Sequence, residues 1–186
     1  MMAARYGISR GLFSNESGLG SAPIVAAAAQ TRNPIRQALV SSSGTFWDTV
    51  VICMLTGIVL VASGHWDDGV DKSIMTQTAF GDLHTIGPVI LTVALLTFVF
   101  STILGWNYYG EKAVEYLMGT RAIKPYRVLW VIAVYFGCVL PNNFVWDLAD
   151  ALNGLMAIPN LIALLLLSGV IAAEIKSNRA ELTGRD

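Results

Sequence analysis

Charged residues are scarce in this chain. Asp, Glu, Lys and Arg make up 13% of its 186 residues, about half of the share in soluble domains. With a net charge of -1 and no block of Lys or Arg, the sequence excludes a nucleic-acid-binding surface. Cys53 and Cys138 both lie in apolar segments, and we interpret them as packing residues. His65 and His84 complete no Ser-His-Asp or His-Glu-x-x-His pattern, so we predict that the protein is not an enzyme.

Hydrophobic residues are abundant, at 54% of the chain, and the mean hydropathy is +0.58. The stretch from Thr85 to Gly110 contains no charged residue at all. About 20 such residues in a helix cross the hydrocarbon core of a bilayer. We therefore predict an all-α integral membrane protein. Its expected parts are a cytoplasmic segment at 1–36 with a short helix from Pro23, four transmembrane helices at about 37–64, 85–112, 126–144 and 147–175, and a cytoplasmic tail at 176–186.

The positive charges predict the orientation of the spans. Every Lys and Arg except Lys72 falls before the first span, between the second and third, or after the fourth. Lys72 lies in a different loop, with Asp67, Asp68, Asp71 and Asp82. Positive residues collect on the cytoplasmic side of membrane proteins. We therefore expect both ends of this segment to be cytoplasmic, with lipid around the spans.

Polar side chains inside the spans are the candidates for function. Ser101 and Thr102 lie in the middle of the second span. Two such hydroxyls can bond back to carbonyls one turn earlier or mediate helix contacts. Alternatively they bind sodium, a hard cation that takes neutral oxygen ligands where a buried carboxylate is costly. The sequence leaves these interpretations open.

Other polar residues have similar alternatives. Trp106 and Asn107 either anchor the span at the interface or line the path of a small polar substrate. Asp48, near the start of the first span, is either a functional acid or a helix-terminal contact. Asp147 and Asp150 are expected to cap the fourth span.

Interruptions are expected within the fourth span as well. Asn153 with Gly154, and Pro159 with Asn160, disturb its helical pattern twice. Freed backbone groups at membrane depth need a neighbouring helix or a cavity to satisfy them. The alternative is a short helix, a turn and a second helix.

Three long motifs together identify a resemblance. They are Arg10-Gly-Leu-Phe-Ser-Asn-Glu-Ser-Gly-Leu-Gly-Ser-Ala-Pro23, Phe98-Val-Phe-Ser-Thr-Ile-Leu-Gly-Trp-Asn-Tyr-Tyr-Gly-Glu111, and Trp146-Asp-Leu-Ala-Asp followed by Asn153-Gly-Leu-Met-Ala-Ile-Pro-Asn160. In this order they resemble the alanine or glycine:cation symporter family. The first motif supplies the family-motif residues Arg10, Gly11, Ser14, Asn15, Glu16, Gly18, Gly20 and Pro23.

The resemblance implies sodium-coupled uptake of alanine or glycine by a five-plus-five inverted-repeat transporter of the LeuT type. The four spans would match core helices seven to ten. Ser101 and Thr102, with the carbonyl of Phe98, would bind the coupling sodium ion. The substrate pathway would be lined by Trp106, Asn107, Asn142 and Trp146.

Family members are more than twice as long as this chain. The resemblance therefore implies that the first repeat and most of helix six, which bind the substrate carboxylate, are missing here. The chain alone is not expected to transport, and the missing N-terminal helices of the same transporter are its expected partners. The alternative from another class is a small non-transporting membrane protein that acts as a structural or assembly partner.

Overall fold

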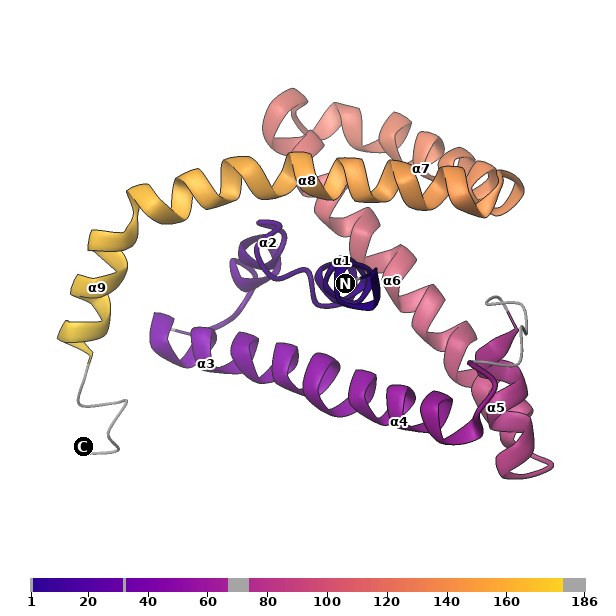
Figure 1. The fold of residues 1–186 in the computed structure, drawn as a ribbon. Helices are drawn as coiled ribbons and strands as arrows, with labels where there is room; N and C mark the ends of the chain where they lie inside the picture. The colour runs from indigo at the N-terminus through magenta and orange to yellow at the C-terminus, as the bar shows by residue number, and fades with distance from the viewer. Residues whose placement is uncertain (1, 32, 67–73, 179–186) are drawn as a thin grey trace. The chain divides into compact units, whose positions relative to one another are not determined.

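The computed structural model describes residues 2–31, 33–66 and 74–178, and the regular structure of these residues is helical, as predicted (Figure 1). The elements in chain order are α1 (Met2–Asn15), α2 (Ala22–Ala26), α3 (Pro34–Thr45), the π-helical η1 (Phe46–Cys53), α4 (Met54–Ser63), α5 (Met75–Leu83), α6 (Gly87–Met118), the 3₁₀-helical η2 (Thr120–Ala122), α7 (Ile123–Val139), α8 (Asn142–Leu166) and α9 (Ser168–Ser177). Arg32, the loop with Asp67, Asp68, Asp71 and Lys72, and the tail from 179 lie outside the described residues.

Four helical stretches of the described residues are long and apolar enough to span a membrane, which confirms the predicted number. They are Pro34–Ser63, Gly87–Met118, Thr120–Val139 and Asn142–Leu166. In each stretch, no residue of the most hydrophobic 18-residue segment is buried inside the protein. Apolar side chains exposed along a whole helix are expected where lipid or further helices cover them. Cys53 and Cys138 are exposed in the same way, so their interpretation as packing residues is wrong within this chain.

The boundary between the third and fourth spans lies at Pro141. α7 ends at Val139, and α8 begins at Asn142, directly after the extended backbone of Pro141. Proline has no N–H and disfavours a helical residue before it, so one helix ends and the next begins there. Asp147 and Asp150 consequently lie inside α8, and the first turn of α8 contains no acid. The predicted capping role of these two residues is therefore wrong.

α8 is continuous through both expected interruptions. It runs past Asn153 and Gly154 and contains Pro159 in its interior. The break comes later, at Leu167, where α9 turns away from the line of α8 (Figure 1). A single proline costs a helix one hydrogen bond, which the flanking turns of a long apolar helix can tolerate in a membrane. Neither the double interruption nor the helix-turn-helix alternative is therefore correct for residues 142–166.

The chain forms two compact units. The first consists of residues 1–49 and 135–186, and the second of residues 50–134. Burial in the first unit centres on the turn after α1, where Leu19 and Ser21 are buried, and on Ile35 at the start of α3. In the second unit α5 packs against α6, and Ala79 of α5 is buried.

The second unit also contains a close approach between α6 and α7. Glycine at position 110 allows it, because a Cβ atom there would overlap the hydroxyl and ring of Tyr126. The Tyr126 hydroxyl donates a hydrogen bond to the carbonyl of Asn107 at 3.4 Å. α6 and α7 are thus held together at the end of the predicted substrate-pathway segment.

We expect Gly110→Ala to destabilise the protein by about 1–3 kcal/mol, because the new methyl group forces the Tyr126 ring out of its position. Gly105→Ala, on the same helix, is the matched control, since nothing lies within 4 Å of its added Cβ. Better helix propensity should leave that variant unchanged or up to about 1 kcal/mol more stable. Thermal unfolding in detergent micelles, followed by circular dichroism, measures both variants. Equal melting temperatures would contradict the proposed overlap.

Candidate functional site

In the first unit, one face of α1 meets one face of α8 through a charged and aromatic cluster. Arg10 forms an ion pair with Asp150, with Nη1 at 3.1 Å from Oδ1, and Ser9 donates a hydrogen bond to the same oxygen at 2.8 Å. The Arg10 guanidinium also lies over the Trp146 ring, 3.8 Å from its centroid. Phe13 meets the same indole edge-on, at 5.5 Å between centroids and 70° between ring planes.

Helical spacing explains this cluster. Arg10 and Phe13 are three residues apart on α1, and Trp146 and Asp150 are four apart on α8, so each pair shares one helix face. In Figure 1, α1 is seen almost end-on while α8 runs across the view, so the two helices cross rather than run side by side. Such a crossing brings only a few residues of each helix together, and here these include a charge pair.

The turn between α1 and α2 has an unusual backbone. Glu16 has a φ of 56°, which is rare for a residue other than glycine, and Gly18 and Gly20 have φ values of 86° and 84°. Two polar contacts hold this turn: Ser21 donates to Glu16 Oε2 at 2.6 Å, and Asn160 of α8 donates to the carbonyl of Gly18 at 2.9 Å. Backbone outliers of this kind concentrate at functional sites, where the surroundings maintain them.

The C-terminal end of α1 is also tied to the first span. Ser14 donates to the carboxylate of Asp48, at 3.1 and 2.9 Å from its two oxygens, and Asn15 donates to the hydroxyl of Thr49 at 2.8 Å. Asp48 and Thr49 belong to the π-helical segment η1. π-helical turns shift side chains relative to an α-helix and are frequent at functional sites. The structure thus gives Asp48 a tertiary contact with α1.

A cavity of about 270 Å³ lies between α1 and α8, next to the cluster. Its apolar wall includes Ile8, Leu12 and Leu19, and its polar wall includes Ser9 and Asp150. This mixed apolar and polar space is therefore lined by Leu12 and Leu19 from the first motif stretch, but by none of the family-motif residues named above. The last of them, Pro23, lies in the first turn of α2.

In the second unit, the hydroxyls of Ser101 and Thr102 converge on one atom. Each donates a hydrogen bond of 2.8 Å to the carbonyl of Phe98. All three predicted sodium ligands are therefore adjacent. The hydroxyl protons point toward the carbonyl, so the free lone pairs of both oxygens face away from it. This is the back-bonded geometry that the sequence left open, and it is also compatible with an ion approaching the two hydroxyl oxygens.

The other predicted residues have simpler surroundings. Trp106 packs edge-on against Tyr109 on α6, with ring centroids 5.8 Å apart, and the Asn107 carbonyl accepts the Tyr126 hydroxyl. Asn142 is the exposed first residue of α8. Of the predicted pathway residues in the first unit, only Trp146 therefore joins the α1–α8 cluster.

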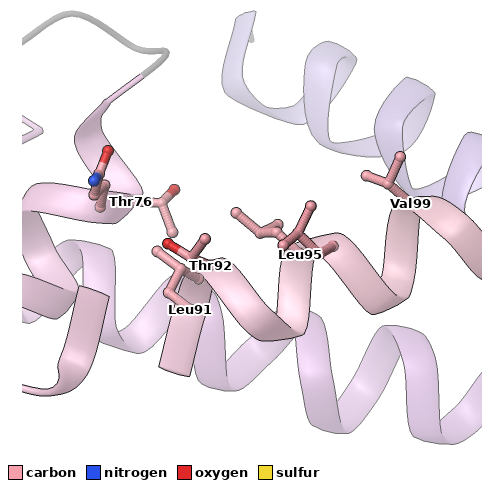
Figure 2. A pocket seen from close by; sticks show the side chains of 7 residues that line it. Thr76, Leu91, Thr92, Leu95 and Val99 are labelled. Carbon is pink, nitrogen blue, oxygen red and sulfur yellow. The ribbon is translucent and has the colours of Figure 1, made fainter. Parts of the chain in front are cut away.

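A larger groove of about 470 Å³ in the second unit contains none of the predicted site residues. Figure 2 shows it between α5 and α6, with Thr76 on one side and Leu91, Thr92, Leu95 and Val99 on the other. The Thr92 hydroxyl donates a hydrogen bond of 2.7 Å to the carbonyl of Pro88. Because this hydroxyl is bonded to its own helix, the groove presents a mainly apolar surface. The groove therefore has the character of a surface that lipid or another helix covers.

Sequence reasoning missed several members of these contacts, among them Thr49 of η1. It does not single out Ser9 or Phe13. For Phe13, three residues from Arg10 on the same helix, the helical spacing is the available signal. Asp150 and Asn160 were noticed, but only as a helix cap and as part of a helix interruption. Their partners lie 140 and 142 positions away, at Arg10 and Gly18, and no local pattern indicates such pairs.

Comparison with known proteins decides the family. Residues 1–184 match the model of the sodium:alanine symporter family. The chain belongs to the sodium:alanine symporter family. Among relatives in this family, the sodium/alanine symporter AgcS of Methanococcus maripaludis is 50% identical over 179 residues, and the probable sodium/glutamine symporter GlnT of Bacillus subtilis is 38% identical over 188 residues.

The alignments cover almost all of this chain but much less of those two symporters. They include 94% and 99% of the chain, against 40% of AgcS and 39% of GlnT. The chain thus spans about two fifths of the length of these relatives. The family resemblance inferred from the three motifs is confirmed, and the family's function is transport, with sodium as the coupling ion.

Proposed function

We propose that this chain forms the C-terminal part of a sodium-coupled symporter for alanine or glycine. The observation that carries the proposal is the family match over residues 1–184. Its four spans and the polar cluster at the α1–α8 crossing are features that a transporter needs. Transport also explains the strained turn better than a structural or assembly partner does, since a packing scaffold requires no such backbone.

The sodium ion is proposed to bind at Ser101, Thr102 and the carbonyl of Phe98, completed by oxygen atoms from helices outside this chain. The three oxygens lie next to one another, but both hydroxyls now donate to the Phe98 carbonyl. Binding of the ion by all three oxygens therefore requires the two hydroxyl protons to rotate away from that carbonyl. Sodium binding favours an outward-open state only if the ion binds that state more tightly than the others. Helices outside this chain that supply the remaining oxygen atoms would then also take part in the coupling.

The substrate is proposed to bind beside the turn at residues 16–21. α1, this turn and α2 have the form of a discontinuous helix, which transporters of the inverted-repeat type use to bind substrates and ions. We assign them to helix six and the four spans to helices seven to ten. Under this assignment the chain contains both halves of helix six, whereas the resemblance in sequence implied that most of this helix is missing. Trp106, Asn107, Asn142 and Trp146 are proposed to line the pathway.

We further propose that the spans lie in the plasma membrane, with the start of the first span and the end of the fourth span on the cytoplasmic side. The N-terminal end of α1, which the sequence placed on the same side, lies on the other side of the membrane if α1 and α2 form helix six. Arg10 is weaker evidence for a cytoplasmic position than the other basic residues, because it lies on α1 and forms an ion pair with Asp150. Arg36, Arg121, Lys124 and Lys176 retain the positive bias on one side of the spans.

The proposed function is tested with a chimera in which this chain replaces the matching segment of the Methanococcus maripaludis symporter. In proteoliposomes, we expect alanine uptake driven by a sodium gradient to exceed uptake in a potassium gradient by about tenfold. The chain alone, reconstituted in the same way, should take up none. Uptake that is equal in sodium and potassium would overturn the proposed coupling.

A further inference from the structure

Three groups restrain the indole of Trp146. The guanidinium carbon of Arg10 lies over the ring, 3.8 Å from its centroid, Phe13 meets the ring edge-on, and Asp150, one helical turn further along α8, holds the Arg10 guanidinium. The restraint on this indole thus comes from another helix through a charge pair.

The ion pair is what makes the stacking of Arg10 specific. A guanidinium over an indole is attracted to the ring only weakly at exposed sites, and a free arginine side chain has many rotamers. The bond from Nη1 to Asp150 Oδ1 selects one of them. Ser9 donates to the same oxygen, which fixes the rotation of the carboxylate. Asp150 therefore determines where the guanidinium lies, and the guanidinium determines where the indole can lie.

The cluster is not a sealed core. The side chains of Arg10 and Asp150 are 35% and 38% exposed, and Trp146 is 38% exposed. The cavity between α1 and α8 borders Ser9 and Asp150 directly. A molecule in that cavity lies next to this cluster, so the orientation of Trp146 can affect how it binds.

We propose that Asp150 is a positioning residue: through Arg10 it fixes the orientation of the Trp146 indole toward the substrate pathway. The part of this inference that concerns transport rests on the proposed function. A purely structural tie between α1 and α8 makes a different prediction. It lowers stability when broken but leaves the affinity for the amino acid unchanged.

The first test uses this chain itself and does not depend on transport. Trp47, Trp66, Trp106 and Trp130 are replaced by phenylalanine, so that only Trp146 fluoresces. In detergent micelles, we expect Asp150→Asn and Arg10→Gln to raise the acrylamide quenching constant about twofold, because one ring face loses its cover. Arg10→Lys should give an intermediate value, since lysine keeps the charge but not the planar group. Unchanged quenching in Asp150→Asn and Arg10→Gln, with unchanged circular dichroism, would overturn the positioning role.

Glu111→Gln is the matched control in this test. It removes the ion pair between Glu111 and Arg127, at 2.7 Å, which belongs to the second unit, whereas the cluster belongs to the first. Its quenching constant should equal that of the parent. If Asp150→Asn or Arg10→Gln loses helical content, Arg10→Lys becomes the deciding variant, because it preserves the charge pair. A quenching constant above that of the parent then supports the positioning role, and an unchanged one overturns it.

The second test measures transport in the chimera. We expect Arg10→Gln and Asp150→Asn to raise the KM for alanine about tenfold while the maximal rate changes less than about twofold. Glu111→Gln should leave both values unchanged. Altered quenching with an unaltered KM would overturn the functional half of the inference. Failure of the parent chimera to transport would instead contradict the proposed function, and the fluorescence result would still decide the positioning role.

Discussion

Replacing Ser101 by alanine and Thr102 by valine in the chimera should reduce the apparent affinity for sodium about a hundredfold. Each oxygen contact with an ion is taken to contribute about 1.5–3 kcal/mol, by analogy with hydrogen bonds to charged groups. Losing two such contacts, with partial replacement by water, costs about 2.7 kcal/mol, which corresponds to that factor. Alanine uptake measured against sodium concentration gives the apparent affinity.

Thr97→Val is the matched control for this experiment. Thr97 lies on the same helix and bonds back to the carbonyls of Val93 and Ala94, at 3.0 and 2.8 Å. Its loss removes the same kind of local hydrogen bond as the loss of Thr102. If the hydroxyls of Ser101 and Thr102 serve only the helix, the double variant and Thr97→Val should behave alike. Equal sodium affinities in the two would therefore exclude Ser101 and Thr102 as ligands.

The four spans were predictable because the membrane imposes a strong and simple constraint. A crossing helix must be about 20 residues long and almost free of charge, and this requirement is visible in Thr85–Gly110 without any tertiary information. Helix ends were less predictable. Pro141 determines where α8 begins, yet the apolar residues on either side of it are compatible with several boundaries.

The helix α1 and the π-helical segment were not predictable in the same way. Gly7 and Gly11 lower the intrinsic helix propensity of α1, so its sequence reads as a polar loop. The segment η1 shifts to wider turns inside an apolar stretch, which has no signature in composition. Tertiary contacts from Ser14 and Asn15 to Asp48 and Thr49 link the two segments.

The candidate site was predictable in its residues but not in its pairs. The motif analysis selected Arg10, Trp146 and the glycines of the turn. It did not connect Arg10 with Asp150, because their attraction depends on a helix crossing that only the folded chain defines. Asp150 looked like a helix cap for the same reason: an acid near an expected helix start is stabilised by the helix dipole, and this local explanation required no partner.

The turn after α1 gives the second large effect, on stability. We expect Gly20→Ala to destabilise the protein by about 3 kcal/mol and Gly18→Ala by about 1–2 kcal/mol, measured as shifts of the thermal unfolding transition in micelles. Both glycines have a positive φ, which costs any other residue about 1–2 kcal/mol. Only at Gly20 would a new Cβ also meet Asn160, at 3.2 Å from its Oδ1.

The additional cost at Gly20 arises from the hydrogen bond that Asn160 makes. Displacing its side chain breaks the bond from Nδ2 to the Gly18 carbonyl and leaves that acceptor without its partner, at about 1–3 kcal/mol. In a double-mutant cycle, Asn160→Ala should therefore remove most of the difference between Gly20→Ala and Gly18→Ala. Additive effects of Gly20→Ala and Asn160→Ala would show that the strain is confined to the backbone. A coupled result would mean that α8 stabilises the turn through Asn160, so that movement of α8 changes the backbone next to the proposed substrate site.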